Sequence, residues 1–221
     1  AALPTWAWPN YVLGNHDEGR IATRFGAEQA RVAAMLLLTL RGTPTIYYGE
    51  EIGMTDVEIP IDEQLDPFGL RVPGWGRDRC RTPMQWSADP LAGFAPQGSK
   101  KLWLPLGEHW QQINVQQQVE APRSHLSFYR QLLAHRKANP VLQRGGYQPL
   151  ENIPEGSFVY QRLGTNQTIT VALNFTGVPL KLPLNGRGQI LLSTQLDRNG
   201  LEDLSALTLR ENEGLIIQNE L

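Results

Sequence analysis

Cysteine, surplus charge of one sign and long apolar runs are all scarce in this sequence of 221 residues. Cys80 is its single cysteine, so no internal disulfide can form and a reducing compartment is expected. The 20 Lys and Arg residues nearly balance the 22 Asp and Glu residues, which leaves no positive excess for a nucleic-acid backbone. The most apolar stretch, residues 33–40, is far shorter than the ~20 residues that span a bilayer. We therefore expect a cytoplasmic protein that binds neither nucleic acid nor membrane.

The composition is otherwise that of an ordinary globular protein, with 41% hydrophobic and 19% charged residues. Such a chain can bury a core, as one large domain or as two small ones. The sequence begins Ala1-Ala2-Leu3, with neither an initiating methionine nor the pattern of a signal peptide. We expect a piece of a longer protein.

The first part of the chain is typical of alternating strands and helices. Apolar residues 11–13 predict a strand that ends in a polar loop, and residues 27–40 predict a helix that Gly42 and Pro44 terminate. Residues 45–48 predict a second strand, which ends in acidic residues. Continuous apolar strands of this kind favour a parallel sheet that is buried on both faces.

Regular periodicity fades between residues 52 and 123, where prolines interrupt any long element. Loops of this length in a compact domain usually bind or cover a ligand. Aromatic side chains that can stack on sugar rings occur along this loop, at Trp75, Trp86, Trp103 and Trp110.

The sequence pattern changes in the last part of the chain. Ser124 can cap a helix that Asn139-Pro140 ends, and short alternating apolar segments follow it. These segments predict an antiparallel β-sandwich with glycine-containing turns. They are residues 158–160, 169–173, 180–182, 190–192 and 215–217. We expect two domains, residues 1–140 and residues 141–221.

The most informative residues are Asn15, His16 and Asp17, directly after the first expected strand. Strands fix polar side chains at their ends, while the loops that follow shape a pocket. Three interpretations are open: helix capping by Asn15 or Asp17, a metal site like the turn of metallophosphoesterases, and sugar chemistry in which Asp17 stabilises positive charge on a distorted ring. The other histidines have no ligand-like spacing, so neither a metal nor another cofactor is expected.

Three motifs together resemble the α-glucosidase branch of the α-amylase superfamily. They are residues 11–17, residues 42–54 with Tyr-Tyr-Gly-Glu-Glu, and residues 77–86 with Arg-Thr-Pro-Met-Gln-Trp. The resemblance extends over essentially the whole chain. It implies an α/β plus all-β fold class: the C-terminal part of a (β/α)8 TIM barrel, with its seventh and eighth strands, followed by an antiparallel β-sandwich domain.

The same resemblance implies roles for site residues. Asp17 would be a catalytic carboxylate that holds sugar hydroxyls and favours an oxocarbenium-like ring, with His16 and Asn15 as substrate-binding neighbours. Arg81 would clamp the non-reducing glucose, for which its planar donor fork is suited. The alternative for Arg81 is a structural ion pair with an acidic neighbour such as Asp78.

Two catalytic groups are not recognisable. A retaining glycosidase needs a carboxylate nucleophile and a carboxylic acid, which lie ~5–5.5 Å apart. In the family they end the fourth and fifth strands, whereas Glu50 and Glu51 belong to the eighth strand and are expected to be structural. The expected partners are therefore an α-glucoside oligosaccharide and an upstream barrel segment of the same protein, without which we expect the chain to be inactive.

The implied reaction is retaining hydrolysis of terminal α-linked glucose from short oligosaccharides. Glucosyl transferases and sucrose or maltose isomerases share these motifs and differ in whether water or a sugar hydroxyl takes the glucosyl group. Two other classes stay open. One is a non-catalytic interaction domain, such as the glucosidase-like ectodomain of amino-acid transporter heavy chains, and the other is a carbohydrate-binding module.

Overall fold

The computed structural model describes residues 3–4, 6–96 and 98–220, which form two compact units. The sheet unit comprises Ala1–Tyr11, Arg31–Thr45 and Phe128–Leu221, and the loop unit comprises Val12–Ala30 and Ile46–Ser127. Each unit is built from segments that are distant in the sequence. The division into domains at residue 140 stays a prediction.

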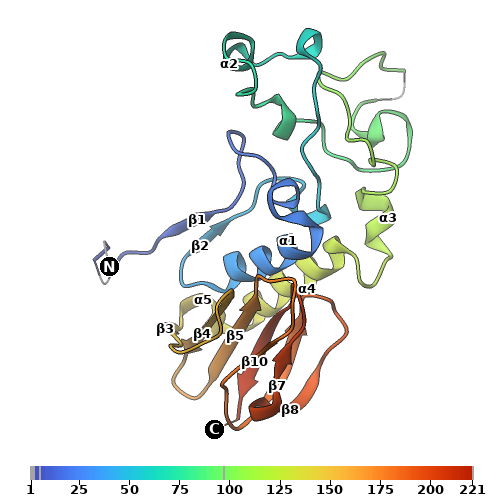
Figure 1. Cartoon of the computed structure of the whole chain (residues 1–221). Coiled ribbons are helices and arrows are strands. Elements are labelled where there is room, and N and C mark those ends of the chain that lie inside the picture. Colours follow the sequence, from blue (N-terminus) through green and yellow to red (C-terminus); the bar gives the residue numbers. More distant parts are fainter. Residues whose placement is uncertain (1–2, 5, 97, 221) are drawn as a thin grey trace. The chain divides into compact units, whose positions relative to one another are not determined.

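A six-stranded antiparallel sheet forms the largest part of the sheet unit (Figure 1). Its strands are ordered β3-β4-β5-β10-β7-β8, and β6 and β9 form a separate antiparallel pair. The bounds are β3 Gly146–Pro149, β4 Ser157–Leu163, β5 Thr168–Asn174, β6 Leu180–Lys181, β7 Arg187–Ser193, β8 Gly200–Asp203, β9 Thr208–Leu209 and β10 Gly214–Asn219. The antiparallel sheet expected at this end of the chain is therefore present.

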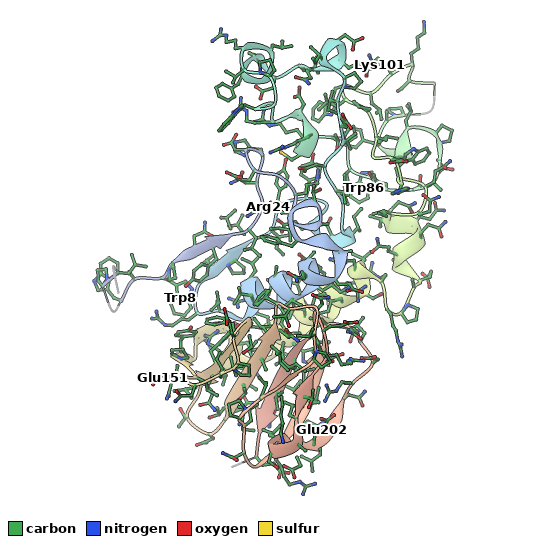
Figure 2. The ribbon with its side chains drawn as sticks, viewed as in Figure 1. Trp8, Arg24, Trp86, Lys101, Glu151 and Glu202 are labelled. Carbon is green, nitrogen blue, oxygen red and sulfur yellow. The ribbon has the colours of Figure 1, made fainter. Side chains whose placement is uncertain are left out.

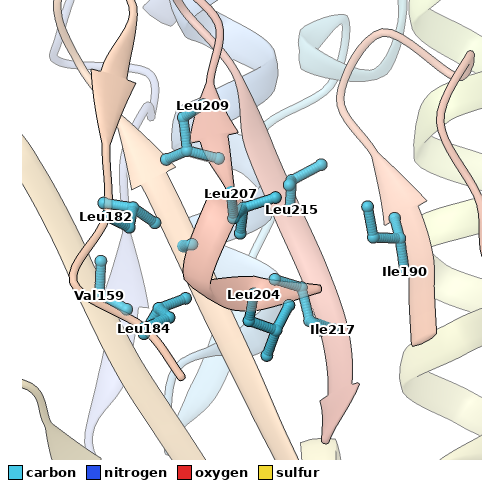
Figure 3. Close-up of a cluster of buried hydrophobic side chains, with 10 residues drawn as sticks. Val159, Leu182, Leu184, Ile190, Leu204, Leu207, Leu209, Leu215 and Ile217 are labelled. Carbon is cyan, nitrogen blue, oxygen red and sulfur yellow. The ribbon is translucent and has the colours of Figure 1, made fainter. Parts of the chain in front are cut away.

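Apolar side chains of the large sheet pack against those of the segments around β6 and β9 (Figure 3). Val159 on β4 and Ile217 on β10 are fully buried there, next to Leu207 and Leu209. Leu204 joins them from the short helix η5 (Leu204–Ala206). Burial of such side chains stabilises the fold by roughly 1.5–3 kcal/mol each, so this cluster is a hydrophobic core of the sheet unit.

Three helices contribute to the unit. They are the C-terminal part of α1 (Ile21–Thr39), α4 (His125–Ala138) and α5 (Pro140–Arg144). Ser124 accepts a hydrogen bond from Ser127 N (3.0 Å), as expected for the cap of α4, and Asn139 caps α5 through Val141 N (2.9 Å). Gly26 interrupts α1 with a non-helical backbone (φ 82°, ψ 161°). The main helix after this break matches the helix expected over residues 27–40, and a short helical piece that begins at Ile21 precedes it.

Buried Arg162 on β4 lies where α1 and α5 end. Its guanidinium donates to the carbonyl oxygens of Thr39 and Leu142, and to those of Gly145 and Gly146. The last carbonyls of a helix have no partner within the helix, so a five-donor group at this place satisfies several at once. Burial lowers the pKa of Arg162 to about 10, and the group stays charged at neutral pH.

The two strands near the N-terminus differ from the predicted ones. The first has the predicted length but begins one residue earlier, and neither strand is buried on both faces, as had been expected. β1 (Asn10–Val12) and β2 (Thr43–Thr45) form a two-stranded sheet in which Thr43 N donates to Pro9 O (2.8 Å). The strand expected over residues 45–48 was wrong beyond Thr45.

The segment with Tyr47 and Tyr48 is not a strand because its polar groups hydrogen-bond elsewhere in the chain. Their hydroxyls donate to Cys80 O (3.1 Å) and Thr82 O (2.6 Å). Tyr48 O accepts from buried Arg20 (2.7 Å), whose guanidinium also lies over both tyrosine rings. Tyr47 N donates to Glu50 Oε2 (3.2 Å), and Tyr47 O accepts from Glu50 N (3.1 Å). These partners satisfy backbone groups that a neighbouring strand would otherwise pair.

Among its described residues, the loop unit has only short elements besides the start of α1. These are η1 (Glu50–Ile52), η2 (Ile61–Glu63), α2 (Pro67–Arg71), η3 (Asp78–Cys80), η4 (Pro90–Gly93) and α3 (Val115–Val119). The sparse periodicity after residue 52 is thereby confirmed. Trp75, Trp86 and Trp103 are exposed, and Trp86 is labelled in Figure 2. Over the described residues, no helix has the length and apolarity needed to cross a membrane.

Candidate functional site

The loop after β1 is shaped by Asn15. Its side-chain oxygen accepts hydrogen bonds from Asp17 N (2.8 Å) and Glu18 N (3.0 Å), which is an Asx-type turn. Asn15 thus closes a turn and does not cap a helix, because α1 begins only at Ile21, so the helix-capping interpretation was wrong for Asn15. Arg24, labelled in Figure 2, donates to Leu13 O (2.8 Å) and ties the start of this loop to α1.

Asp17 is held by two arginines. Its Oδ1 accepts from Arg77 Nη1 and from Arg81 Nη2, each at 3.1 Å. Arg81 also donates from Nε to His16 O (2.7 Å), so its fork spans the backbone and the carboxylate of the same loop. The structure thus brings three of the predicted residues, His16, Asp17 and Arg81, into one cluster.

The acidic partner of Arg81 is Asp17 and not Asp78, while the choice between a structural and a substrate-binding role for Arg81 stays a prediction. Asp78 is buried, and its Oδ2 accepts from Leu65 N (2.6 Å) and Asp66 N (2.8 Å). Asp78 therefore organises the loop backbone, while the carboxylate that binds Arg81 is the predicted catalytic residue Asp17. The guanidinium of Arg81 remains partly exposed and faces the loop after β1.

The electrostatics of the cluster keep Asp17 negatively charged. The hydrogen bond from Arg77 lowers the pKa of Asp17, and the charges of His16, Arg77 and Arg81 act in the same direction. His16 Nε2 lies 3.4 Å from Asp17 Oδ2, and both side chains are exposed to solvent. An ionised and accessible carboxylate can hydrogen-bond sugar hydroxyls or stabilise a cation, whereas a general acid needs a raised pKa.

Two residues of the cluster were missed from the sequence, Arg77 and Asp66. Arg77 Nε and Nη2 donate to the two carboxylate oxygens of Asp66, each at 2.8 Å. The signal available was the alternation of Arg and Asp in residues 77–81, which is ambiguous without the fold. In the part of the chain that the structure describes, no group of three or more His, Cys, Asp and Glu side chains could hold a metal ion.

Glu50 is buried beneath the loop and is not part of the cluster. Its Oε2 accepts from Tyr47 N (3.2 Å), and a Cβ at Gly14 would come within 2.4 Å of its Oε1. Burial raises the pKa of Glu50 to about 7. The contacts support the expected structural role of this carboxyl, since it packs under Gly14 and not toward solvent.

Replacement of Glu50 by Gln is expected to change the pH dependence of stability. Between pH 4.5 and about 7 the folded protein retains a proton that the unfolded chain has released, so the free energy of unfolding falls as pH rises. The loss amounts to about 3 kcal/mol. In urea denaturation, the free energy of unfolding of Glu50→Gln should rise relative to that of wild type from pH 4 to pH 8. That of Glu51→Gln, in which the replaced carboxylate is partly exposed, should not. Parallel stability profiles for Glu50→Gln and wild type would refute this.

A family model supports the interpretation of these motifs. Residues 1–145 match the model described as "Alpha amylase, catalytic domain". The chain belongs to the α-amylase family. The matched residues include the loop with Asp17, the Tyr47–Glu51 segment and the loop with Arg77 and Arg81.

Relatives place the chain in the α-glucosidase branch of the α-amylase family. The salivary alpha-glucosidase of Anopheles gambiae is 38% identical over 83% of this chain and 31% of its own length. The human amino acid transporter heavy chain SLC3A1 is 34% identical over 98% of this chain and 32% of its own length. The chain therefore spans about a third of these two relatives.

Solved structures of the α-amylase family agree on the fold. The trehalulose synthase MutB from Pseudomonas mesoacidophila MX-45 is superposed with a TM-score of 0.85 at 26% identity, over 98% of this chain and 44% of that one. The fold class is thus that of the C-terminal part of a TIM-barrel enzyme of the α-amylase family, with an antiparallel sheet at its end.

Proposed function

We propose that this chain forms the Asp17 side of the glucose site in a retaining α-glucosidase, which releases terminal α-linked glucose from short oligosaccharides. The observation that carries this proposal is the exposed, ionised Asp17 held by Arg77 and Arg81. The named function of the Anopheles relative supports it. A pure interaction surface has no physical need for a carboxylate whose charge is maintained by two guanidinium groups.

Each of the three side chains in the cluster has its own role in this reaction. Asp17 accepts hydrogen bonds from two sugar hydroxyls and stabilises the positive charge that develops on the ring in the transition state. His16 donates to a hydroxyl of the same ring. Arg81 binds oxygens at the non-reducing end through its remaining guanidinium N–H groups, because Nε and one N–H of Nη2 already donate to His16 O and Asp17.

The nucleophile and the general acid come, in this proposal, from the barrel part that the relatives have and this chain does not match. In the first step the nucleophile attacks the anomeric carbon, while the acid gives its proton to the leaving oxygen. In the second step the residue that acted as the acid takes a proton from water. The water attacks the anomeric carbon and breaks its bond to the nucleophile, which releases glucose with the α configuration. In this proposal Asp17 gains or loses no proton in either step, in keeping with its lowered pKa.

Two alternatives have support from named relatives. A glucosyl transferase or isomerase, as in the trehalulose synthase, would pass the glucosyl group to a sugar hydroxyl in place of water. A non-catalytic interaction domain, as in the transporter heavy chain, would use the fold without turnover. Incubation of the longest form of the protein that cells make with maltose and with sucrose, followed by NMR, separates these functions. Early α-glucose supports the proposal, whereas rearranged disaccharides or unchanged sugars support the alternatives.

Arg81→Ala is expected to weaken substrate binding more than it slows turnover. Hydrogen bonds to a charged group contribute about 1.5–3 kcal/mol, which corresponds to a KM raised by about 10- to 100-fold. Arg81→Lys keeps the charge but loses the fork, so its KM should lie between those of wild type and Arg81→Ala. Initial rates with maltose measure both constants. An unchanged KM in Arg81→Ala would show that this side chain does not contact the sugar.

A further inference from the structure

A second carboxylate, Asp66, lies behind the arginine that contacts Asp17. Arg77 donates from Nε to Asp66 Oδ2 and from Nη2 to Asp66 Oδ1, both at 2.8 Å. This paired geometry fixes the plane of the guanidinium. The remaining nitrogen, Nη1, donates to Asp17 Oδ1 at 3.1 Å. One arginine therefore joins the two carboxylates.

Asp66 is itself held rigidly. Its side chain is 1% exposed and accepts two backbone hydrogen bonds, from Phe68 N (3.2 Å) at the start of α2 and from Arg77 N (2.9 Å). Its own backbone N–H donates to Asp78 (2.8 Å). By contrast, the side chains of Arg77 and Asp17 are 36% and 50% exposed. Of the three connected residues Asp66, Arg77 and Asp17, Asp66 is thus the most rigidly held.

The backbone brings Asp66 and Arg77 together through a close approach of two glycines. A Cβ on Gly69, in α2, would lie 2.6 Å from the Cα of Gly76, the residue before Arg77. No side chain fits at this contact. The segment that carries Asp66 and the segment that carries Arg77 can therefore pack closely enough for both hydrogen bonds.

We propose that Asp66 is a positioning residue for Asp17, which it orients through Arg77. The proposal rests on the function proposed above, in which Asp17 is the charge-stabilising carboxylate. A free, partly exposed arginine samples many rotamers, whereas an arginine fixed at two donors keeps its third donor aimed at one place. The carboxylate of Asp17 then starts each reaction in the orientation that the transition state requires.

The test needs no turnover, because the ionisation of Asp17 reports its contact with Arg77. The charged groups that face Asp17 are His16, Arg77 and Arg81. NMR titration of the Asp17 carboxyl carbon in the chain should show its pKa rising in Asp66→Asn. Asn can still cap α2, so the helix start is retained. The matched control is Asp78→Asn. The Asp78 side chain accepts from the backbone N–H groups of Leu65 and Asp66, and Asn keeps an oxygen that can accept from them, so the pKa of Asp17 should not change.

A double-mutant cycle distinguishes positioning from general loosening of the loop. Arg77→Lys removes the fork and should raise the pKa of Asp17 by itself, which also serves if Asp66→Asn does not fold. Adding Asp66→Asn to Arg77→Lys should then cause no further rise, because Asp66 acts through Arg77. An additive rise, an unchanged pKa in Asp66→Asn, or an equal rise in Asp78→Asn would overturn the proposal.

Activity gives a separate readout. In the longest form of the protein that cells make, Asp66→Asn should lower kcat by about 10- to 100-fold with little change in KM, since a misplaced Asp17 affects the transition state most. If the protein shows no glycosidase activity while the titration results hold, the proposed function has failed and the positioning contact stands. Full kcat in Asp66→Asn, in an active enzyme, would overturn the positioning role.

Discussion

Asp17→Asn is expected to lower kcat for α-glucosides by about 10³-fold in the longest form of the protein that cells make. Asn keeps the size of the side chain and one acceptor oxygen, but it removes the negative charge that the two arginines maintain. That charge is needed most when the sugar ring becomes positive, so kcat falls more than KM rises. Rates with an aryl α-glucoside measure the effect.

The matched control is Asp62→Asn, an exposed carboxylate in the same unit. Its loss should leave kcat unchanged, and circular dichroism should show both variants folded. Turnover near the wild-type value in Asp17→Asn would remove Asp17 from the reaction. An equal loss in both variants would instead indicate a general effect of charge on the protein.

Arg162→Met is expected to lower the free energy of unfolding by about 3–5 kcal/mol. Methionine approximates the volume of the arginine stem but leaves the carbonyl oxygens of Thr39, Gly145 and Gly146 without the donors of Arg162. Leu142 O keeps a longer hydrogen bond from Arg136 (3.3 Å). These oxygens lie around a side chain that is 0% exposed, so water does not replace the lost hydrogen bonds.

Urea denaturation of the purified chain measures this loss. Arg187→Met is the control, because Arg187 is on β7 of the same sheet and its side chain is exposed. A surface change of that kind alters stability by no more than about 0.5 kcal/mol. Equal stabilities of Arg162→Met and Arg187→Met would show that the helix ends do not depend on Arg162.

The sequence predicted the elements that carry their own periodicity. The segments at 158–160, 169–173 and 215–217 lie within β4, β5 and β10, because a run of apolar and β-branched residues is a local pattern. The expected alternation is not seen in β5 and β10, in which most consecutive residues are buried. Three strands were missed, namely β3, β8 and β9. β3 has exposed residues throughout, and β9 is two residues long. Such strands exist through pairing with a neighbour, which a local pattern does not contain.

The candidate site divides in the same way. The loop with Asn15, His16 and Asp17 was predictable because these residues are consecutive at a strand end, and Arg81 followed from its motif. The pairing of Asp66 with Arg77 was not predictable from the sequence, because the segment between them has no regular periodicity and contains only the short helix α2. Likewise, Tyr47 and Tyr48 are residue types typical of a strand. Their hydroxyls instead donate to carbonyl oxygens distant in the sequence, and Tyr48 O accepts from Arg20.

The central claim is that Asp17 supplies negative charge to a positively charged sugar ring. Calorimetry in the longest form of the protein that cells make tests it most directly, with deoxynojirimycin, a protonated iminosugar, compared with neutral glucose. The account predicts that Asp17→Asn weakens iminosugar binding by about 100-fold and glucose binding much less, because only the iminosugar carries the charge. An equal loss for both ligands would contradict the claim, since Asp17 would then act only as a hydrogen-bond acceptor.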